Sequence, residues 1–492
     1  MKKYNFVCVQ TIFNERMDTK KLRQKILDLA IHGKLVPQDP NDEPASVLLE
    51  RIRAEKERLI AEGKIKRSKK SATSDTPHYE NEVPFEVPEG WEWVSLSEIA
   101  HSCLGKMLDK AKNQGTLQPY LRNVNVRWGT FELEDLLQMP FVEEEDERFS
   151  VVQGDLVVCE GGEPGRCAIW ENNESIKFQK ALHRIRCFNG ALNYYIKIVI
   201  EWYAASKNIE LYYTGSTIKH LTGEALNTLQ IPLPPIQEQH HIVSIVDQWM
   251  SLIDLFDTES SELKQSIEKA KSKILDLAIH GKLVPKDPND EPASELLKRI
   301  NPKAVASCDN PHYGKVPSSW VISTVGEVFT INPKTHAEDD TEAAFVPMTC
   351  VADGYSNTFE YECRKWGDIK KGFVHFQEND VAVAKISPCL ENRKSVVFHD
   401  LPNGIGAGTT ELNVFRCAEV LPEYALFYFK SKMFIGSCAG TYNGVVGQQR
   451  VAKSFIQELP IGIPPYNEQL RIVSKVNDLF SHLDMIEKSL QA

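Results

Sequence analysis

The sequence predicts an α+β protein in which two mixed α/β domains are separated by a long antiparallel coiled-coil helical frame. Two observations predict this architecture: a segment that occurs twice, and helical runs whose apolar residues alternate steps of four and three. The first copy of the segment, KILDLAIHGKLVPQDPNDEPASVLLERI, covers residues 25–52, and the second covers residues 273–300. They are identical at 25 of 28 positions and differ only at Gln38/Lys286, Val47/Glu295 and Glu50/Lys298.

A second pair of segments marks the start of two helices. LPPIQEQHHIVSIVDQWMSLIDLFD at 233–257 resembles IPPYNEQLRIVSKVNDLFSHLDMIE at 463–487, and both read P-P-x-x-E-Q before a helical pattern. Proline suits the first turn of a helix because the N–H groups there have no partner within the helix. We therefore predict that a helix begins after each proline pair.

The central helix is predicted from about Gln237 to His280, where Gly281 supplies a left-handed C-cap and Pro285 prevents continuation. Its apolar seam, interrupted only at Ser260, is typical of a coiled coil. The seam residues are Ile242, Val246, Trp249, Ile253, Phe256, Leu263, Ile267, Ala270, Ile274 and Leu277.

The two chain ends are predicted to supply the partner strand of this coil. Helical runs near Leu22–Leu29, ending at Gly33, and Ile472–Leu490 continue the same alternation. The C-terminal run matches the first half of the central helix, and the N-terminal run matches its second half. Because the chain then reads as two equivalent halves, we expect internal pseudo-twofold (circular) symmetry.

Two unlike inserts fill the gaps between these helices. Each opens with P-H-Y and V-P-x-x-W and closes at P-P-x-x-E-Q, and runs such as GDLVVCEGG (154–162) and NDVAVAKIS (379–387) predict short β-strands. The predicted regions are 1–76 (N-terminal extension, repeated helix and basic linker), 77–236 (first domain), 237–305 (central helical region), 306–465 (second domain) and 466–492 (C-terminal helix).

Composition bounds the class of protein. The apolar, charged and aromatic fractions of 42%, 25% and 9% are those of an ordinary globular protein, and no apolar run is long enough to span a bilayer. The first residues lack the cleavage site of a signal peptide, and eleven cysteines without C-x-x-C spacing favour reduced cytosolic thiols. We therefore expect a cytoplasmic protein. The net charge of −11 does not favour a nucleic-acid binder.

The sequence contains no recognisable active site. It has no G-x-x-x-x-G-K-[ST] phosphate loop, and EGGEPGRC at 160–167 lacks the Lys-Ser/Thr that would hold phosphate and Mg²⁺. GIPPYNE at 462–468 lacks the amine-binding residue of an amino-methyltransferase motif, and Asp380 with Lys385 does not complete a nuclease set.

The histidines do not predict a metal site. His240 and His241 are adjacent, so they point to different sides of a helix, and His32 and His280 each precede a C-capping glycine, where a cation suits the helix dipole. No metal or cofactor is expected on this chain.

The motifs together resemble those of one known family. A helix carrying KILDLAIHGKLVPQDPNDEPA, a domain opened by VPEGWEW and closed by IPLPPIQEQ, and the repetition of this arrangement are similar to the specificity subunit of type I restriction–modification systems. The resemblance covers the chain from about Met17 to Ala492, and residues 1–16 lie outside it.

The resemblance implies a non-catalytic subunit with two target-recognition domains, each reading one half of a bipartite, asymmetric site on double-stranded DNA. It implies that the coiled coil fixes the spacer between the halves. It also implies docking of two methyltransferase subunits, which bring S-adenosylmethionine, and of motor-nuclease restriction subunits. Two copies of one partner need two copies of one docking surface, which explains the repeated segment. The acidic balance implies that partners supply much of the contact to phosphates.

Candidate DNA-contacting residues follow from side-chain chemistry. Arginine bridges guanine O6 and N7, and asparagine bridges adenine N6 and N7, while Ser, Thr and Lys suit phosphates. In the first domain the candidates are Arg122, Asn123, Asn125, Arg127, Arg166, Gln179, Lys180, His183, Ser216, Thr217 and Lys219. In the second domain they are Lys385, Arg393, Lys394, Thr409, Thr410, Asn443, Gln448, Gln449 and Arg450.

Two other functions stay open at this point. A structural adaptor, whose coiled coil spaces two protein- or glycan-binding domains, is favoured by the acidic charge and opposed by the paired repeats. A self-sufficient methyltransferase or nuclease is opposed by the missing cofactor and metal motifs. Salt-dependent DNA binding seen only with a methyltransferase partner separates the adaptor from the specificity subunit.

Overall fold

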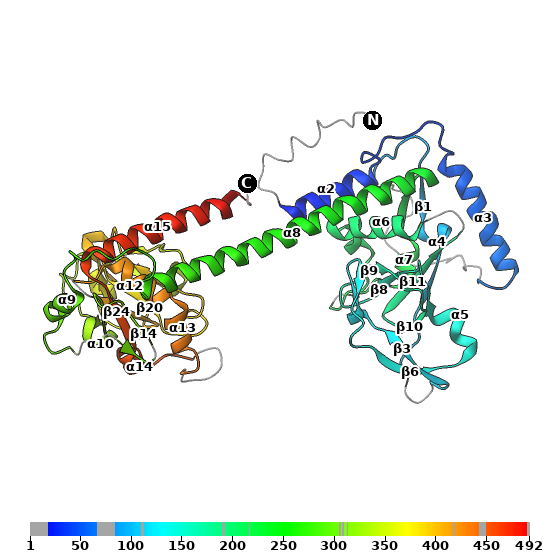
Figure 1. The fold of residues 1–492 in the computed structure, drawn as a ribbon. Coiled ribbons are helices and arrows are strands. Elements are labelled where there is room, and N and C mark those ends of the chain that lie inside the picture. Colours follow the sequence, from blue (N-terminus) through cyan, green and yellow to red (C-terminus); the bar gives the residue numbers. More distant parts are fainter. Residues whose placement is uncertain are drawn as a thin grey trace. The chain divides into compact units, whose positions relative to one another are not determined.

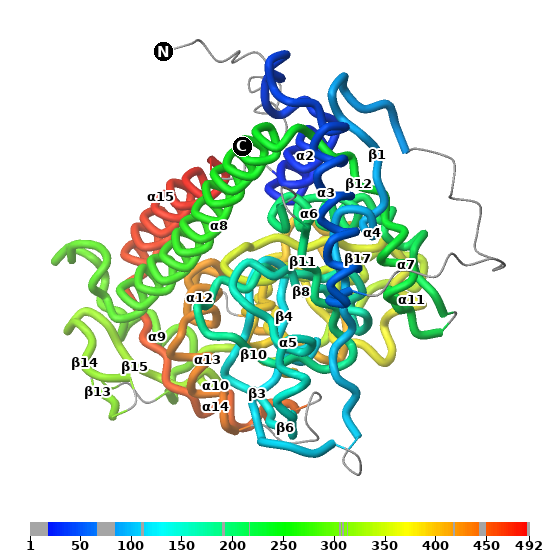
Figure 2. The backbone as a smooth tube through the Cα atoms, turned by 90° about the vertical axis from the view of Figure 1, so that its right-hand side faces the viewer, coloured from blue at the N-terminus to red at the C-terminus, as the bar shows by residue number. Residues whose placement is uncertain are grey.

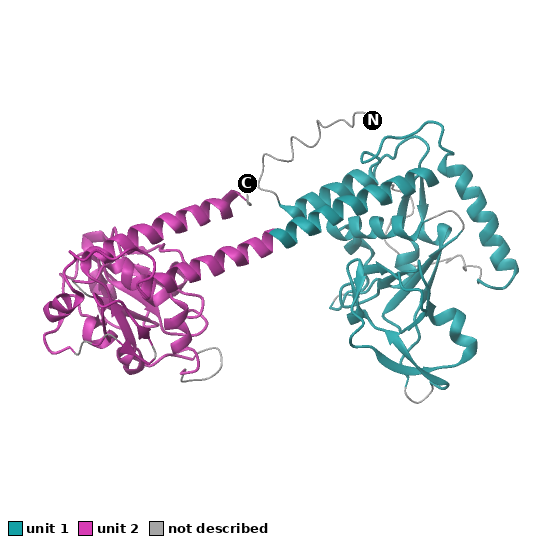
Figure 3. Ribbon diagram, in the orientation of Figure 1, with its two compact units in different colours: residues 1–259 teal, residues 260–492 magenta. Residues whose placement is uncertain are grey.

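The chain forms two compact units, residues 1–259 (unit 1) and 260–492 (unit 2), which Figure 3 colours separately. The computed structural model describes residues 18–65, 84–109, 113–188, 192–215, 217–304, 307, 309–311, 313–416, 419–441 and 449–489. The boundary between the units falls inside helix α8 (Ile236–Ile279), at Ser260, where the apolar seam of the sequence is interrupted.

The predicted helix boundaries are confirmed. Helix α8 begins directly after Pro234-Pro235, and helix α15 (Tyr466–Ser489) begins after the second proline pair. Helix α2 (Thr19–Ile31) starts where the Asp18 carboxylate accepts hydrogen bonds from the Lys20 and Lys21 amides. Gly33 and Gly281, which follow α2 and α8, have φ of 63° and 65°, the left-handed conformation expected of a C-cap.

Unit 1 contains two four-stranded sheets with the orders β2-β11-β8-β9 and β6-β3-β10-β7, and two-stranded pairs β1-β12 and β4-β5. The strands are β1 (Glu92–Ser95), β2 (Ala100–Leu104), β3 (Thr116–Leu121), β4 (Val126–Arg127), β5 (Thr130–Phe131), β6 (Leu137–Phe141), β7 (Ser150–Val151), β8 (Leu156–Cys159), β9 (Cys167–Ile169), β10 (Ile176–Phe178), β11 (Leu182–Cys187) and β12 (Gln230–Leu233). The other α-helices are α3 (Ala45–Ala61), α4 (Leu96–Ile99), α5 (Asp146–Phe149), α6 (Asn193–Ala205) and α7 (Gly223–Asn227).

Strand β8 shows how the sequence builds this core. All four of its residues are buried, and alternate side chains enter different clusters because successive residues of a strand point to opposite faces. Leu156 and Val158 join the core that contains α6, whereas Val157 and Cys159 join the core shared with β3 and β6. The helix α6 contacts α2 as well as β8, β9 and β11, so it lies between the N-terminal helix and the sheet (Figure 1).

Unit 2 repeats the two four-stranded sheets as β16-β23-β20-β21 and β18-β17-β22-β19 and the pair β1-β12 as β15-β24, and it contains a further pair, β13-β14, that precedes β15. Its strands are β13 (Asp309–Asn310), β14 (Gly314–Lys315), β15 (Val321–Thr324), β16 (Thr330–Ile331), β17 (Glu342–Val346), β18 (Glu362–Lys365), β19 (Val374–Gln377), β20 (Val381–Ala384), β21 (Ser395–Val397), β22 (Ile405–Gly408), β23 (Leu412–Arg416) and β24 (Pro460–Ile463). Its remaining helices are α9 (Ala293–Ile300), α10 (Val325–Val328), α11 (Trp366–Ile369), α12 (Pro422–Lys430), α13 (Lys432–Cys438) and α14 (Lys453–Glu458).

Strand β20 divides its side chains as β8 does. Val381 and Val383 face the core of α12, and Ala382 and Ala384 face the core shared with β17. The predicted strands in 154–162 and 379–387 are therefore confirmed as the buried centres of the two units. Helix α12 contacts β20, β21 and α15.

A buried glutamate joins the repeated motifs in each unit. In unit 1 the Trp91 indole donates to Glu238 at 2.8 Å, and Gly33 lies so close to Trp91 and Pro88 that a Cβ there would meet the Pro88 ring at 2.4 Å. The next residue, Gln239, accepts from the Leu192 amide at 3.3 Å.

Unit 2 makes the corresponding contacts. Trp320 donates to Glu468 at 3.0 Å, and Gln469 accepts from the Leu421 amide at 2.8 Å. Lys286 additionally forms an ion pair with Glu468, which is 1% exposed. Gln38 occupies the matching position of unit 1, and burial raises the pKa of Glu238.

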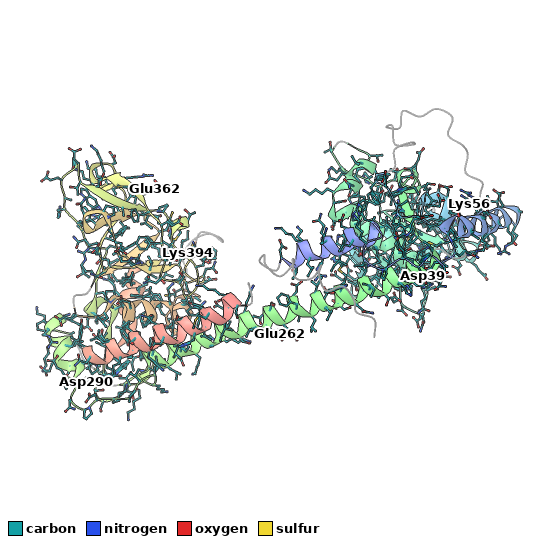
Figure 4. All side chains as sticks on the ribbon, turned by 90° about the horizontal axis from the view of Figure 1, so that it is seen from above. Asp39, Lys56, Glu262, Asp290, Glu362 and Lys394 are labelled. Carbon is teal, nitrogen blue, oxygen red and sulfur yellow. The ribbon has the colours of Figure 1, made fainter. Side chains whose placement is uncertain are left out.

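Within each unit a terminal helix lies along part of α8. In unit 1 Arg23, near the start of α2, donates to Asp254 at 2.8 Å and to Asp257 at 2.9 Å. In unit 2 Lys271 pairs with Asp484 of α15 at 2.6 Å, and Figure 2 shows α15 beside this part of α8. Asp290, labelled in Figure 4, accepts from Arg471 at 2.5 Å and fixes the second repeat against the start of α15.

Gln38 and Lys286 occupy matching positions beside the buried glutamates Glu238 and Glu468. We expect that giving each position the residue of the other changes the stability of the two units in opposite directions. Lys286→Gln removes the cation beside Glu468 and should lower the free energy of unfolding of unit 2 by about 2 kcal/mol, because a buried carboxylate is left without its charge partner. Gln38→Lys should raise that of unit 1, because Glu238 then gains a cation. Chemical denaturation, monitored by hydrogen exchange in each unit, measures both effects. Lys282→Gln, which changes an exposed lysine of the same loop, is the control.

Candidate nucleic-acid interface

Four loops of unit 1 meet at one edge of its sheets. Strands β3 and β10 are parallel, so their carboxyl ends lie at the same edge. The loops that follow are joined by backbone hydrogen bonds: Gln179 N to Leu121 O at 3.1 Å, Glu160 N to Ala181 O at 2.9 Å, and Leu221 N to Glu160 O at 2.8 Å. We call residues 122–135, 160–166, 179–181 and 212–221, apart from Ser216, which lies outside the described residues, the loop cluster of unit 1.

Unit 2 builds the same edge with the same bonds. Strands β17 and β22 are parallel, and Thr409 N donates to Val346 O at 3.2 Å. Lys385 N donates to Glu411 O at 2.9 Å, and Val451 N donates to Lys385 O at 2.9 Å. Residues 347–354, 385–394, 409–411 and 449–451 form the loop cluster of unit 2. Its backbone framework matches that of unit 1, whereas its side chains differ.

Most of the candidates of unit 1 are brought together on this cluster. Lys180, Thr217 and Lys219 are exposed, and Asn123, Gln179 and Arg127 are partly exposed. Gly162, with φ of 82°, lets the Asn123 amide approach, because a Cβ there would lie 2.8 Å from its nitrogen.

An exposed histidine in this region was missed by the sequence analysis. His220 lies beside Gly161, whose Cβ would be 3.1 Å from the imidazole Nδ1. The only signal for it in the sequence was its place next to the glycine-flanked candidates, because a lone histidine carries no motif.

Two candidates of unit 1 lie inside the protein and hold the loops. Asn125 is 2% exposed, accepts from the Arg122 amide at 2.9 Å and donates to Glu132 O at 3.0 Å. His183 is 1% exposed, its Nε2 lies 3.0 Å from Leu221 O, and burial lowers its pKa. Neither side chain presents a face to a base in this structure, so we remove both from the proposed base-contacting set.

Two arginines of unit 1 are also largely enclosed. Arg122 donates to Asp135 at 2.7 Å with a side chain 19% exposed. Arg166 donates to Glu163 at 2.8 Å and to Asn123 O at 2.8 Å with a side chain 14% exposed. Arg122 bonds within its own loop, residues 122–135, whereas Arg166 ties residues 160–166 to Asn123 of that loop.

In unit 2 the candidates divide in the same way. Thr410 and Arg450 are exposed, and Lys385, Thr409 and Gln449 are partly exposed. Asn443 and Gln448 lie outside the described residues.

Two further basic candidates of unit 2 act within the loops. The ammonium of Lys394, labelled in Figure 4, donates to Val351 O at 2.7 Å and to Met348 O at 3.3 Å. Arg393, at φ of 59°, donates to Lys430 O at 3.2 Å, and its guanidinium lies over the Tyr355 ring. Like Arg122 and Arg166, both residues are better placed to hold the loops in position than to contact a base.

A buried lysine that sequence reasoning missed joins two of these loops. Lys430, at the end of α12, is 1% exposed, and its ammonium donates to Gly354 O at 2.7 Å and to Arg393 O at 2.8 Å. Burial, together with the nearby Arg393 charge, lowers its pKa to about 7, while Asp353 opposes this effect. A lysine at the end of a helical run is usually exposed, so the sequence carries no sign of this role.

Carboxylates pair with the exposed basic side chains of both clusters. Arg127 binds Glu132 at 2.7 Å, Lys219 binds Glu210 at 2.8 Å, and Arg450 binds Glu411 at 2.8 Å. These pairs reduce the positive potential that either unit offers to a phosphate backbone, in agreement with the net charge of −11.

The described residues contain no group of three or more His, Cys, Asp or Glu side chains placed to hold a metal ion. His32 and His280 instead use Nδ1 at 2.7 Å from Asp28 O and Asp276 O, one helical turn earlier. Among the described helices, none combines the length and the apolar character that a membrane span requires.

Comparison with known proteins gives one family. The type I restriction modification DNA specificity domain model matches residues 88–265 and 317–492. The chain is 42% identical over 243 residues to the type I restriction enzyme EcoEI specificity subunit of Escherichia coli, covering 45% of this chain and 40% of that protein. It is 38% identical over 273 residues to the EcoAI specificity subunit of Escherichia coli, covering 50% and 46%. The chain thus spans less than half the length of these two curated relatives.

A likeness over most of the chain comes from a solved structure. A chain from a type I R-M system, described for its complex assembly and conformational transition, has a TM-score of 0.56 with 15% identity and covers 83% of this chain and 94% of its own length. At this identity the likeness concerns the fold, and it agrees with two mixed α+β domains.

We expect Lys430→Met to change how stability depends on pH. Between pH 7 and 10.5 the unfolded chain binds a proton at Lys430 that the folded chain does not bind, so falling pH destabilises the wild type until the folded pKa of about 7 is reached. The Met variant lacks this penalty. Relative to the wild type it should gain about 2 kcal/mol in free energy of unfolding between pH 9 and pH 7. Denaturant titrations of unit 2 at both pH values measure the difference, and an equal difference at both would contradict the role of this ammonium.

Proposed function

This chain belongs to the type I restriction modification DNA specificity domain family, and we propose that it is the non-catalytic specificity subunit of a type I restriction–modification system. In this proposal each unit reads one half of a bipartite, asymmetric site on double-stranded DNA. The observation that carries the proposal is the loop cluster, which is built twice on one backbone framework and carries different side chains each time.

The difference between the clusters explains why one chain reads two sequences. In unit 1 strand β3 is followed by Arg122 and Asn123, whereas in unit 2 strand β17 is followed by Pro347 and Met348. The framework bonds at 2.8–3.2 Å keep the loop positions alike. Base contacts depend on side-chain donors and acceptors, so two such clusters specify two different half-sites.

The proposed DNA contacts come from the candidates that are exposed or partly exposed, together with Ser216, Asn443 and Gln448, which lie outside the described residues. Lysine and threonine side chains suit phosphate oxygens, whereas amide and guanidinium groups suit base edges. The proposed phosphate contacts are Lys180, Ser216, Thr217, Lys219, Lys385, Thr409 and Thr410, and the proposed base contacts are Asn123, Arg127, Gln179, Asn443, Gln448, Gln449 and Arg450.

We infer that two methyltransferase subunits dock on the two copies of the repeated segment. Positions such as Lys34/Lys282 and Pro40/Pro288 are exposed in both copies. A shared partner accounts for their identity. In the proposed complex the methyltransferases carry S-adenosylmethionine, motor-nuclease subunits complete the restriction activity, and the helices α2, α8 and α15 form a pseudo-twofold coiled-coil frame that sets the spacer.

One observation favours the adaptor as a second candidate. Carboxylates pair with basic side chains in both loop clusters, which weakens DNA binding by the free chain. The two functions differ in their response to a partner, because a specificity subunit should bind DNA tightly only with its methyltransferase.

We expect co-expression with the neighbouring methyltransferase gene in a methylation-free host to produce one split motif with a fixed gap. Sequencing that detects modified adenine provides the readout, and omission of this chain is the control. A stable complex without any motif would contradict DNA reading by this system, and the absence of both motif and complex would favour the adaptor.

We expect Lys180→Ala to weaken DNA binding of the complex almost equally for all sequences. Loss of one phosphate contact should reduce the slope of log affinity against log salt by about 1 and leave the motif unchanged. Salt titrations by fluorescence anisotropy measure the slope. Lys64→Ala, at an exposed lysine beyond the end of α3, should leave it unaltered. A changed motif in Lys180→Ala would instead assign this side chain to a base.

A further inference from the structure

We propose that the ion pairs Arg127–Glu132 and Arg450–Glu411 are composite reading elements, each complementary to one G·C base pair in its half-site. This inference rests on the proposed function and assigns the two carboxylates, which the sequence analysis did not single out, a part in specificity. The pairs lie in the loop clusters of unit 1 and unit 2 respectively.

The geometry of the two pairs is alike although they come from different strands and loops. In unit 1 the Arg127 Nε and Nη2 donate to the two Glu132 carboxylate oxygens at 2.9 and 2.7 Å. In unit 2 the same two nitrogens of Arg450 donate to the Glu411 oxygens, both at 2.8 Å. Two parallel bonds of this kind hold the planar fork of the guanidinium in one orientation. The Glu132 carboxylate occupies two of the five N–H donors of Arg127.

Exposure separates these pairs from the other charged pairs of the clusters. The Arg127 and Arg450 side chains are 41% and 45% exposed, whereas that of Arg166 is 14% exposed and is also tied to a backbone carbonyl. The Lys219–Glu210 pair is exposed, but an ammonium is a point charge without a fixed plane. Only the Arg–Glu pairs combine an exposed position with a defined orientation among the charged pairs described in the clusters.

The backbone also fixes the position of each carboxylate. The Glu132 amide donates to Asn125 O at 2.8 Å, and the Asn125 side chain donates to Glu132 O at 3.0 Å. In unit 2 the Glu411 amide donates to Thr409 Oγ1 at 3.3 Å, and Glu411 O accepts from Lys385 N at 2.9 Å. Neither pair therefore needs to be assembled when DNA arrives.

The donors and acceptors of such a pair match those of a G·C base pair in the major groove. Guanine presents two acceptors, O6 and N7, and cytosine presents the N4 amino donor beside them. An arginine directed at guanine and a carboxylate directed at cytosine satisfy all three groups. An A·T pair instead offers a donor at adenine N6 where guanine has O6, and an acceptor at thymine O4 where cytosine has its amino group.

The carboxylates stay ionised at neutral pH. Hydrogen bonding to Arg127 lowers the pKa of Glu132, and hydrogen bonding to Arg450 lowers that of Glu411. An ionised carboxylate accepts hydrogen bonds and donates none, so it discriminates for the cytosine amino group. It also repels phosphate, which keeps the arginine from serving as a general backbone contact.

The test uses the complete complex with its methyltransferase and compares Glu132→Gln with Glu411→Gln. Each change keeps the size of the side chain and adds a donor. We expect Glu132→Gln to relax one G·C position of one half-site, with roughly tenfold or greater loss of preference, and to leave the other half-site intact. Glu411→Gln should do the opposite. Each variant thus controls for folding and assembly of the other, and an exposed ion pair contributes too little to stability for either to unfold a unit.

Two outcomes would overturn the inference without affecting the proposed function. One is a wild-type motif that both variants preserve at every position. The other is relaxation of an A·T position. If a variant yields no methylation, a second experiment measures binding of the wild-type complex to DNA that carries 7-deazaguanine at each guanine in turn. A tenfold loss of affinity at one guanine in each half-site supports the inference. Unchanged affinity at all of the guanines contradicts it. A wild-type complex that produces no motif would overturn the proposed function instead.

Discussion

Each unit depends on a buried glutamate that receives an indole hydrogen bond at the first turn of a long helix. Glu238 accepts from Trp91, and Glu468 accepts from Trp320. The glutamine that follows each glutamate accepts from the amide of the residue before α6 in unit 1 and before α12 in unit 2. The three repeated motifs of the sequence, V-P-x-x-W, P-P-x-x-E-Q and the repeated segment at Gly33 or Gly281, therefore meet at one point. A buried carboxylate without hydrogen-bond partners is costly, so loss of the tryptophan or the glutamate alone should destabilise its unit.

This junction separates a constant part of each unit from a variable part. On one side lie the repeated helices, with the exposed residues of the repeated segment. On the other side a buried central strand, β8 or β20, divides its side chains between two cores and carries the loops at its end. Because backbone hydrogen bonds hold the loops in place, their side chains can differ without disturbing the framework. In the proposed function this separation lets identical partners accompany unlike base readers.

The electrostatics of the loop clusters favour selectivity over affinity. Arg127 and Arg450 are paired with carboxylates, and Lys394 and Lys430 donate from their ammonium groups to carbonyl oxygens of neighbouring loops. Such side chains are oriented before any ligand arrives, and the charge of the two paired arginines is offset by their carboxylates. An acidic chain of this design gains specificity from a few directed contacts, while partner subunits are left to supply the attraction to phosphates.

The sequence by itself determined the helices α2, α8 and α15, the buried strands β8 and β20, and the repetition of motifs, because apolar periodicity, proline and glycine act locally. The sequence also indicated candidate residues that lie in the two loop clusters, because these residues follow strands or flank glycines. Only the tertiary structure decided which of them face outward. Asn125 and His183 are polar residues in polar runs, yet both are buried: Asn125 bonds Arg122 and Glu132 within its own loop, and His183, on β11, lies against Leu221 O. Lys430 is buried, and Glu132 and Glu411 become partners of arginines, because strand pairing and loop contacts bring together residues up to 76 positions apart.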